Sequence, residues 1–140
     1  MPGTDPTHWL RRFDADEWLL AADTELRHCE ETLARRAVRP AVTHARRAAG
    51  MAWNAVLVLT ADSAAAEKFG RSYMDHVVAL TTAALIPDEI RAAARTLRET
   101  PPVAPELITL GKPDMRVLEE ARRIVAYAVE RVAALRARTH

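Results

Sequence analysis

The sequence predicts an all-α protein, an up-and-down antiparallel bundle of four to five helices. Three stretches carry apolar residues alternately three and four positions apart, which is the spacing of one face of an α-helix. The composition is rich in Ala, Leu, Val, Arg and Glu, and only 5% of the residues are aromatic, which favours helices over strands. The 140 residues suit one domain over 1–140, with its core at about 14–136.

The first two helices are expected over 14–37 and from Pro40 onward. Asp14 followed by Glu17 has the spacing of a capping box, and proline is favoured in the first turn of a helix. Gly50 lies in the second helix beside a face made largely of alanine, and close packing against another helix is the expected compensation for its low helix propensity. The inward positions are Leu19, Ala22, Leu26, Cys29, Leu33 and Ala37 in the first helix, and Val42, Ala45, Ala49, Ala52, Val56 and Leu59 in the second.

Three further helices follow. The third is expected over 72–85, and Pro87 opens a shorter fourth one. Residues 99–113 hold four prolines and a glycine, so they form the one long irregular connection before a last helix from Pro113 or Asp114 to about Arg136. The inward positions of the three helices are, in turn, Met74, Val77, Val78 and Leu85; Ile90, Ala94 and Leu97; and Leu118, Ala121, Val125, Ala128, Val132 and Leu135.

The composition also excludes several classes of protein. The single cysteine, Cys29, cannot form an internal disulfide and is expected to be a small buried apolar residue. No apolar run reaches the roughly 18 residues of a membrane span, and the first twenty residues lack the apolar segment of a signal peptide. We therefore expect a cytoplasmic protein with no membrane partner.

The net charge of +1 conceals two segments of opposite charge. Residues 1–34 hold eight acids and three arginines, whereas residues 35–50 hold five arginines and no acid. Arginine forks bind phosphate well, so the second segment is a candidate site for an anion, a nucleotide or RNA. The alternative is a solvated face that pairs with the acids of the first helix. The residues proposed for anion binding are Arg39, His44, Arg46 and Arg47.

The order of these features resembles the HEPN (higher eukaryotes and prokaryotes nucleotide-binding) domain family, over about residues 18–134. The resemblance rests on five features: an opening helix with Ala22, Glu25-Leu26 and Leu33; an alanine-rich helix over 44–52; a segment with Gly70, His76 and Leu80; a proline-led helix over 87–97; and Pro113-Asp114 before a long last helix. It implies a helical bundle that forms a homodimer. Some members are metal-independent ribonucleases, often toxins or defence effectors. Others are non-catalytic and pair with small nucleotidyltransferases or bind nucleotides.

Ribonuclease members carry an arginine, then four to six intervening residues, then a histidine. Arg71 with His76, and Arg39 with His44, have this spacing, and they would supply phosphate binding and proton transfer. With 18 arginines in the chain, about two such pairs arise by chance, so the spacing alone decides nothing. The leading hypothesis is thus a non-catalytic dimeric module that acts in a toxin–antitoxin or defence setting. The alternative is a ribonuclease that uses Arg71 and His76. A third interpretation makes His76 a polar residue on a helix face.

Neither a metal nor another cofactor is predicted. Metal sites in helical bundles commonly use Glu-x-x-His on paired helices, and this spacing occurs once here, in Glu25 and His28. His44 and His76 could also meet across two helices, with Asp75 or Glu67 nearby, but no spacing supports a site there. The large side chains of Trp18 and Trp53 lie beside the predicted inward faces, where they would either complete the core or anchor the dimer interface.

Overall fold

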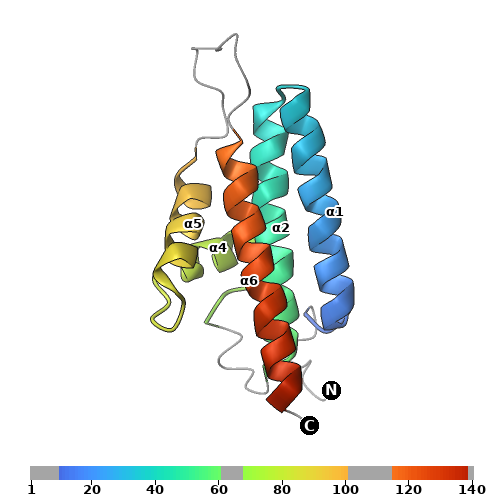
Figure 1. Ribbon diagram of the computed structural model, residues 1–140, viewed down its shortest axis with the longest axis vertical. Coiled ribbons are helices and arrows are strands. Elements are labelled where there is room, and N and C mark those ends of the chain that lie inside the picture. The colour runs from blue at the N-terminus through green and yellow to red at the C-terminus, as the bar shows by residue number, and fades with distance from the viewer. Residues whose placement is uncertain (1–9, 61–67, 101–114, 139–140) are drawn as a thin grey trace, which may run out of the picture.

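The computed structural model describes residues 10–60, 68–100 and 115–138, and within these ranges it contains helices and no strand (Figure 1). This confirms the predicted all-α bundle. The helices are α1 (Ala15–Ala34), α2 (Val38–Val58), α4 (Tyr73–Leu80), α5 (Asp88–Glu99) and α6 (Arg116–Arg138).

Four of these helices alternate in direction. Figure 1 shows α1 running up, α2 down, α5 up and α6 down, while the short α4 lies behind α6 beside α2. The three long helices α1, α2 and α6 lie side by side, and α5 flanks them on the side away from α1. The up-and-down order is therefore correct, with α4 inserted between its second and third members.

The turn between α1 and α2 is built from backbone hydrogen bonds. At the other end of α1, before this turn, Asp14 caps the helix and exchanges hydrogen bonds with Glu17, as the capping-box spacing predicts. Arg36 adopts a left-handed conformation with φ of 60°, and the N–H of Ala37 donates to the carbonyl of Thr32 at 2.8 Å. This closure ends α1 before the predicted boundary at 37. It also places Pro40 in the first turn of α2, as expected.

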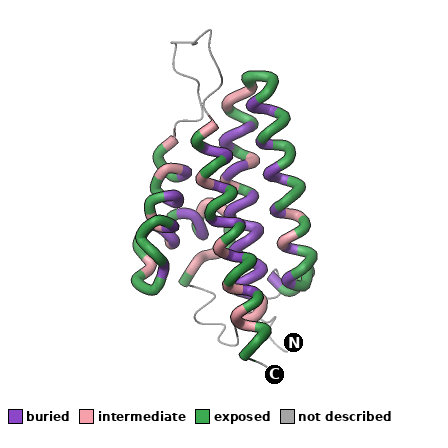
Figure 2. The backbone as a smooth tube through the Cα atoms, in the orientation of Figure 1, coloured by how far each residue is buried: buried purple, intermediate pink, exposed green. Residues whose placement is uncertain are grey.

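Helix α2 is the centre of the bundle. Residues 48–57 are all buried, so this part of the helix is covered on every face, not only on the alanine-rich face that the spacing predicts (Figure 2). A helix that is enclosed in this way must carry apolar or small residues all round. Its neighbours α1, α4, α5 and α6 each contact it.

Gly50 lets α4 approach α2. A Cβ atom built on Gly50 would lie 2.4 Å from the Cβ and 2.6 Å from the Cα of Tyr73, which is the first residue of α4. Both distances are shorter than any real contact between such atoms, so only glycine fits here. The predicted reason for this glycine, close helix packing, is confirmed.

Helix α4 is shorter than predicted. It ends at Leu80, and the hydroxyl of Thr81 then donates to the carbonyl of Val78 at 2.6 Å, which satisfies a carbonyl at the helix end. Because the chain turns here and does not continue to 85, Leu85 is 95% exposed, and Val78 also faces solvent. Their assignment to the core was wrong.

The last two described helices agree with the sequence more closely. In α5, Ile90, Ala94 and Leu97 are buried, as the spacing predicts. In α6, every predicted inward position is buried except Leu135, which is partly exposed near the end of the helix. Most of the connection predicted over 99–113, and the predicted start of the last helix at Pro113 or Asp114, lie outside the described residues.

Gly50→Ala should destabilise the protein by about 1–3 kcal/mol, because the added methyl group collides with the backbone of Tyr73. The substitution would otherwise stabilise a helix by about 1 kcal/mol, so the sign of the effect distinguishes packing from helix propensity. Urea unfolding followed by circular dichroism measures it. An equal or higher free energy of unfolding for the variant would contradict the close contact.

Candidate functional site

The candidate site is built around Glu25, a charged residue on the buried face of α1. Ala22, Leu26 and Cys29 on the same helix are buried, and the spacing of the helix places Glu25 beside them with 8% of its surface exposed. A carboxylate at the edge of a core needs polar partners to offset the loss of water.

Helix α2 supplies these partners. The Nδ1 atom of His44 lies 2.6 Å from Oε2 of Glu25, and a guanidinium nitrogen of Arg47 lies 3.2 Å from Oε1. His44 and Arg47 are three positions apart, so both project from one face of α2 toward α1. Each carboxylate oxygen of Glu25 therefore has its own partner on the facing helix.

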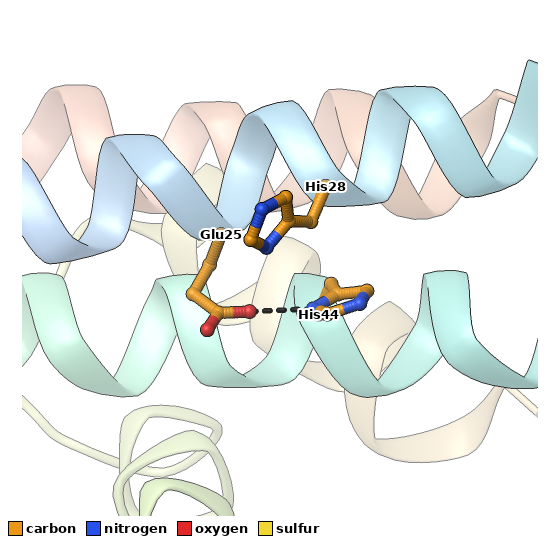
Figure 3. Close-up of side chains that lie close together, drawn as sticks. All are labelled: Glu25, His28 and His44. Atoms are coloured by element: carbon orange, nitrogen blue, oxygen red, sulfur yellow. Dashed lines mark hydrogen bonds and ion pairs between the residues drawn. The ribbon is translucent and has the colours of Figure 1, made fainter.

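His28 completes the group. It lies one turn after Glu25 on α1, and its ring centre is 5.1 Å from that of His44, with the two rings at 61° (Figure 3). One ligand atom each of Glu25, His28 and His44 can be chosen so that all three lie within 4.8 Å of one another. His28 is exposed and His44 is partly exposed, so solvent reaches the group from the side of the imidazoles.

Two imidazoles and a carboxylate form a donor set that can hold a divalent metal ion. The Glu25-x-x-His28 spacing was visible in the sequence, but no metal was predicted because a second copy of the motif is missing. The third donor comes instead from a single histidine on α2. Glu25 itself was a sequence signal for this group, because an acidic residue at a buried position of a helix needs polar partners from a neighbouring element.

Two arginines of the arginine-rich segment, Arg46 and Arg47, bind other parts of the protein. Nε of Arg46 donates to the carbonyl of Leu97 at 2.8 Å, and a terminal nitrogen donates to that of Thr100 at 2.9 Å, so Arg46 satisfies carbonyls at the end of α5. Burial lowers the pKa of Arg46. Of the predicted anion-binding residues, Arg46 is therefore engaged with α5 and Arg47 pairs with Glu25, while Arg39 is exposed; anion binding by this set stays a prediction.

Two other acids of α1 pair with α6. Arg122 lies 2.8 Å from Glu30, and Arg136 lies 2.9 Å from Asp16. The alternative expectation, that the arginine-rich segment pairs with acids of the first helix, thus holds for Arg47 with Glu25. Helix α6 supplies the partners of Glu30 and Asp16.

His76 is part of the core. It is 0% exposed, its Nδ1 lies 2.6 Å from the carbonyl oxygen of Phe69, and its Nε2 lies 2.6 Å from the amide of Asn54 on α2. Burial lowers the pKa of His76, while the Phe69 carbonyl and the Asp75 carboxylate oppose this to a smaller extent. A neutral imidazole with its proton on Nδ1 donates to the Phe69 carbonyl and accepts a hydrogen bond at Nε2. The Asn54 amide must then turn its NH2 group toward Nε2. In the other orientation that NH2 group has no partner among the described residues.

The predicted catalytic pair is therefore not assembled as an accessible site. Arg71 is exposed, whereas the ring of His76 is enclosed and has both nitrogens engaged. His76 also does not meet His44, because its partner Asn54 lies ten residues further along α2, or about 15 Å. Glu67, the other residue considered for that metal site, lies outside the described residues.

The two tryptophans are core residues of this single chain. Trp18 is 1% exposed and donates from its indole to the carbonyl of Leu10 at 2.8 Å, and Trp53 is 4% exposed and stacks on Tyr127. The inward face of α1 runs through Ala15 and Trp18, not through Leu19. Neither tryptophan has surface left to anchor a dimer, so of the two roles considered the structure supports the core.

Cys29 is buried, as expected. Burial raises the pKa of its thiol to about 11, with a smaller opposing effect of Arg122. The thiol is therefore enclosed and protonated at neutral pH, which makes it unreactive as a nucleophile.

Comparisons with protein-family models, with curated proteins and with solved structures found no match to this chain. None of the described helices combines the length and the apolar character that crossing a membrane requires.

Arg46→Lys should lower the free energy of unfolding by about 1–2 kcal/mol, because an ammonium group cannot reproduce the forked hydrogen bonds to the end of α5. Arg39→Lys, at an exposed position of the same segment, is the matched control and should change it by less than about 0.5 kcal/mol. Chemical denaturation measures both. Equal effects would contradict the structural role of Arg46.

Acid should destabilise the protein through His76. Its pKa in the folded state lies below the ordinary value of 6.5, so the unfolded chain takes up the proton first as the pH falls. The contribution of neutral His76 is complete above pH 6.5 and is lost as the pH falls through the lower, folded-state pKa. The wild type should thus lose more stability than His76→Gln between pH 7.5 and 5. Parallel pH profiles for the two proteins would contradict this.

Proposed function

We propose that the protein is a non-catalytic, dimeric binding module of the HEPN type that acts in the cytoplasm. It partners a small nucleotidyltransferase or binds a nucleotide-like ligand, in a toxin–antitoxin or defence setting. The observation that carries the non-catalytic part of the proposal is the enclosure of His76. A ribonuclease would need this imidazole at the surface beside Arg71 to move a proton on RNA.

The order of the helices supports the resemblance. A capped first helix, an alanine-rich second helix, a short helix containing His76, a proline-led helix and a long last helix follow one another in the expected sequence. In this arrangement His76 serves to tie α4 to α2 through Asn54. The ribonuclease alternative has no comparable observation in its favour.

A homodimer has a suitable surface where α1 and α6 meet. The ion pairs Arg136–Asp16 and Arg122–Glu30 hold the two helices antiparallel. Leu20 on α1 is 64% exposed, and it lies four positions after Asp16 on the same side of the helix. Val129 on α6 is also exposed and lies seven positions, or two turns, from both arginines. This surface thus presents apolar side chains between charged pairs, which suits a second copy of the chain.

We place the nucleotide-like ligand at the start of α4. A shallow hollow there is lined by Lys68, Phe69, Asp75 and Val78, among others. It offers a cation for a phosphate and apolar surface for a base or ribose. This surface replaces the arginine-rich segment as the preferred binding place, because Arg46 and Arg47 are engaged within the protein.

The wild type should have a mass of twice 15.5 kDa in light scattering at high concentration. The double variant Leu20→Glu/Val129→Glu should be monomeric, since it would place four like charges in the twofold interface. Leu85→Glu is the matched control, because Leu85 is the most exposed large apolar residue of the described chain and belongs to the connection between α4 and α5, not to α1 or α6; it should leave the dimer intact. A monomeric wild type would contradict the dimer, and dissociation by Leu85→Glu would contradict its location.

A further inference from the structure

We propose that Glu25, His28 and His44 form a mononuclear site for a divalent transition-metal ion between α1 and α2, and that zinc is the ion that fits it best. This proposal goes beyond the binding function above and does not rest on it. Its basis is the convergence of three donor side chains from two helices on one point (Figure 3).

The donor types favour zinc over the common hard cations. Imidazole nitrogen with one carboxylate oxygen is a frequent ligand set for zinc, whereas magnesium and calcium prefer sites made of oxygen ligands. Iron(II) also uses two histidines and one carboxylate, and it is the nearest competitor. Cys29 on the same helix is buried, so its sulfur does not add to the set.

The geometry needs only small side-chain movements. Three ligands of a tetrahedral zinc ion with bonds of about 2.05 Å lie about 3.3 Å apart. The chosen ligand atoms of the three residues are all within 4.8 Å of one another, and Nδ1 of His44 is 2.6 Å from Oε2 of Glu25. A metal would take the place of the proton between these two atoms, which would separate by less than 1 Å. His28, which is exposed, would move toward them by rotation of its side chain.

The surroundings hold two of the three ligands in place. Glu25 is fixed beside the core, and its second oxygen is held by Arg47, so Oε2 remains directed at His44. His44 lies on α2, the central helix of the bundle. Hydrogen bonds of this kind to metal ligands commonly tune the site and orient its donors.

Three protein ligands leave one position of a tetrahedral ion open. Because His28 and His44 are the more exposed members, that position faces solvent, where water or an anionic group of a ligand can bind. An open position is typical of zinc sites that bind or activate small molecules, and a closed set of four ligands is typical of structural zinc.

The competing explanation is that Glu25, His44 and Arg47 form only a structural ion-pair network. His28 separates the two explanations, since it takes no part in the ion pairs of Glu25 and contacts His44 only through the ring edge. Replacing His28 should leave the network intact and should weaken a metal site.

The test is a titration of the full chain with zinc sulfate in competition with a chromophoric chelator. We expect one zinc ion per chain for the wild type, at least about 10–100-fold weaker affinity for His28→Ala and for His44→Gln, and no response to magnesium. His44→Gln keeps a group that donates a hydrogen bond to Glu25, so this variant should remain folded. The control His8→Gln/His140→Gln should bind zinc like the wild type, which excludes chelation by the two histidines that remain besides His28, His44 and the buried His76.

Thermal unfolding gives a second readout. Zinc should raise the midpoint of the wild type by several degrees and should leave that of His28→Ala unchanged, while both proteins have similar midpoints without metal. Failure of the wild type to bind zinc, or equal affinity in His28→Ala, would overturn the proposal. Loss of binding in His8→Gln/His140→Gln alone would also overturn it, because the ion would then be held elsewhere.

Discussion

The enclosure of α2 is the constraint on which the rest of the structure depends. A helix surrounded by four others must carry apolar or small side chains all round, and residues 48–52 of α2 are alanine and glycine apart from Met51. Gly50 is the extreme case, because the backbone of α4 occupies the place of its missing side chain. The close approach of α4 in turn carries His76 into the core, where Asn54 of α2 receives it. The close packing at Gly50 thus determines both the position of α4 and the burial of His76.

Polar side chains on the packed faces of α1 and α2 need hydrogen-bond partners, and they find them in two different environments. Asn54 and His76 are fully enclosed and hydrogen-bond to each other, which ties α4 to the centre. Glu25 and His44 lie at the edge, where an exposed imidazole of His28 stands beside them. Enclosure makes the first pair structural, since no solute reaches it. Access to solvent makes the second group the one place among the described residues where donor atoms converge and remain reachable.

Much of the fold could be predicted because its signals are local. The capping box at Asp14, the prolines at 40 and 87 and the three- and four-residue spacings depend on residues close in sequence. The errors arose where distant parts of the chain decide. The end of α4 depends on how the chain turns toward α5, so Leu85 was misplaced; the inward face of α1 depends on α2 and α6, so Trp18 was assigned to an edge. The candidate site was half visible, as Glu25 and His28, but the register that brings His44 opposite them is a property of the α1–α2 packing and not of either segment alone.

The surface proposed for dimerisation and the candidate metal site lie on different sides of α1. Successive residues of a helix turn by about 100°, so Asp16 and Glu30 fall on the side that faces α6, His28 and Glu25 fall on the flank that faces α2, and Leu20 lies between them, nearest to Asp16. A second copy packed against α1 and α6 would therefore leave the imidazoles open to solvent. Because the two surfaces share no residue, charges placed at Leu20 and Val129 act on association alone, and the change at His28 acts on metal binding alone. The evidence for each proposal is thus independent of the other, and either can fail without weakening its counterpart.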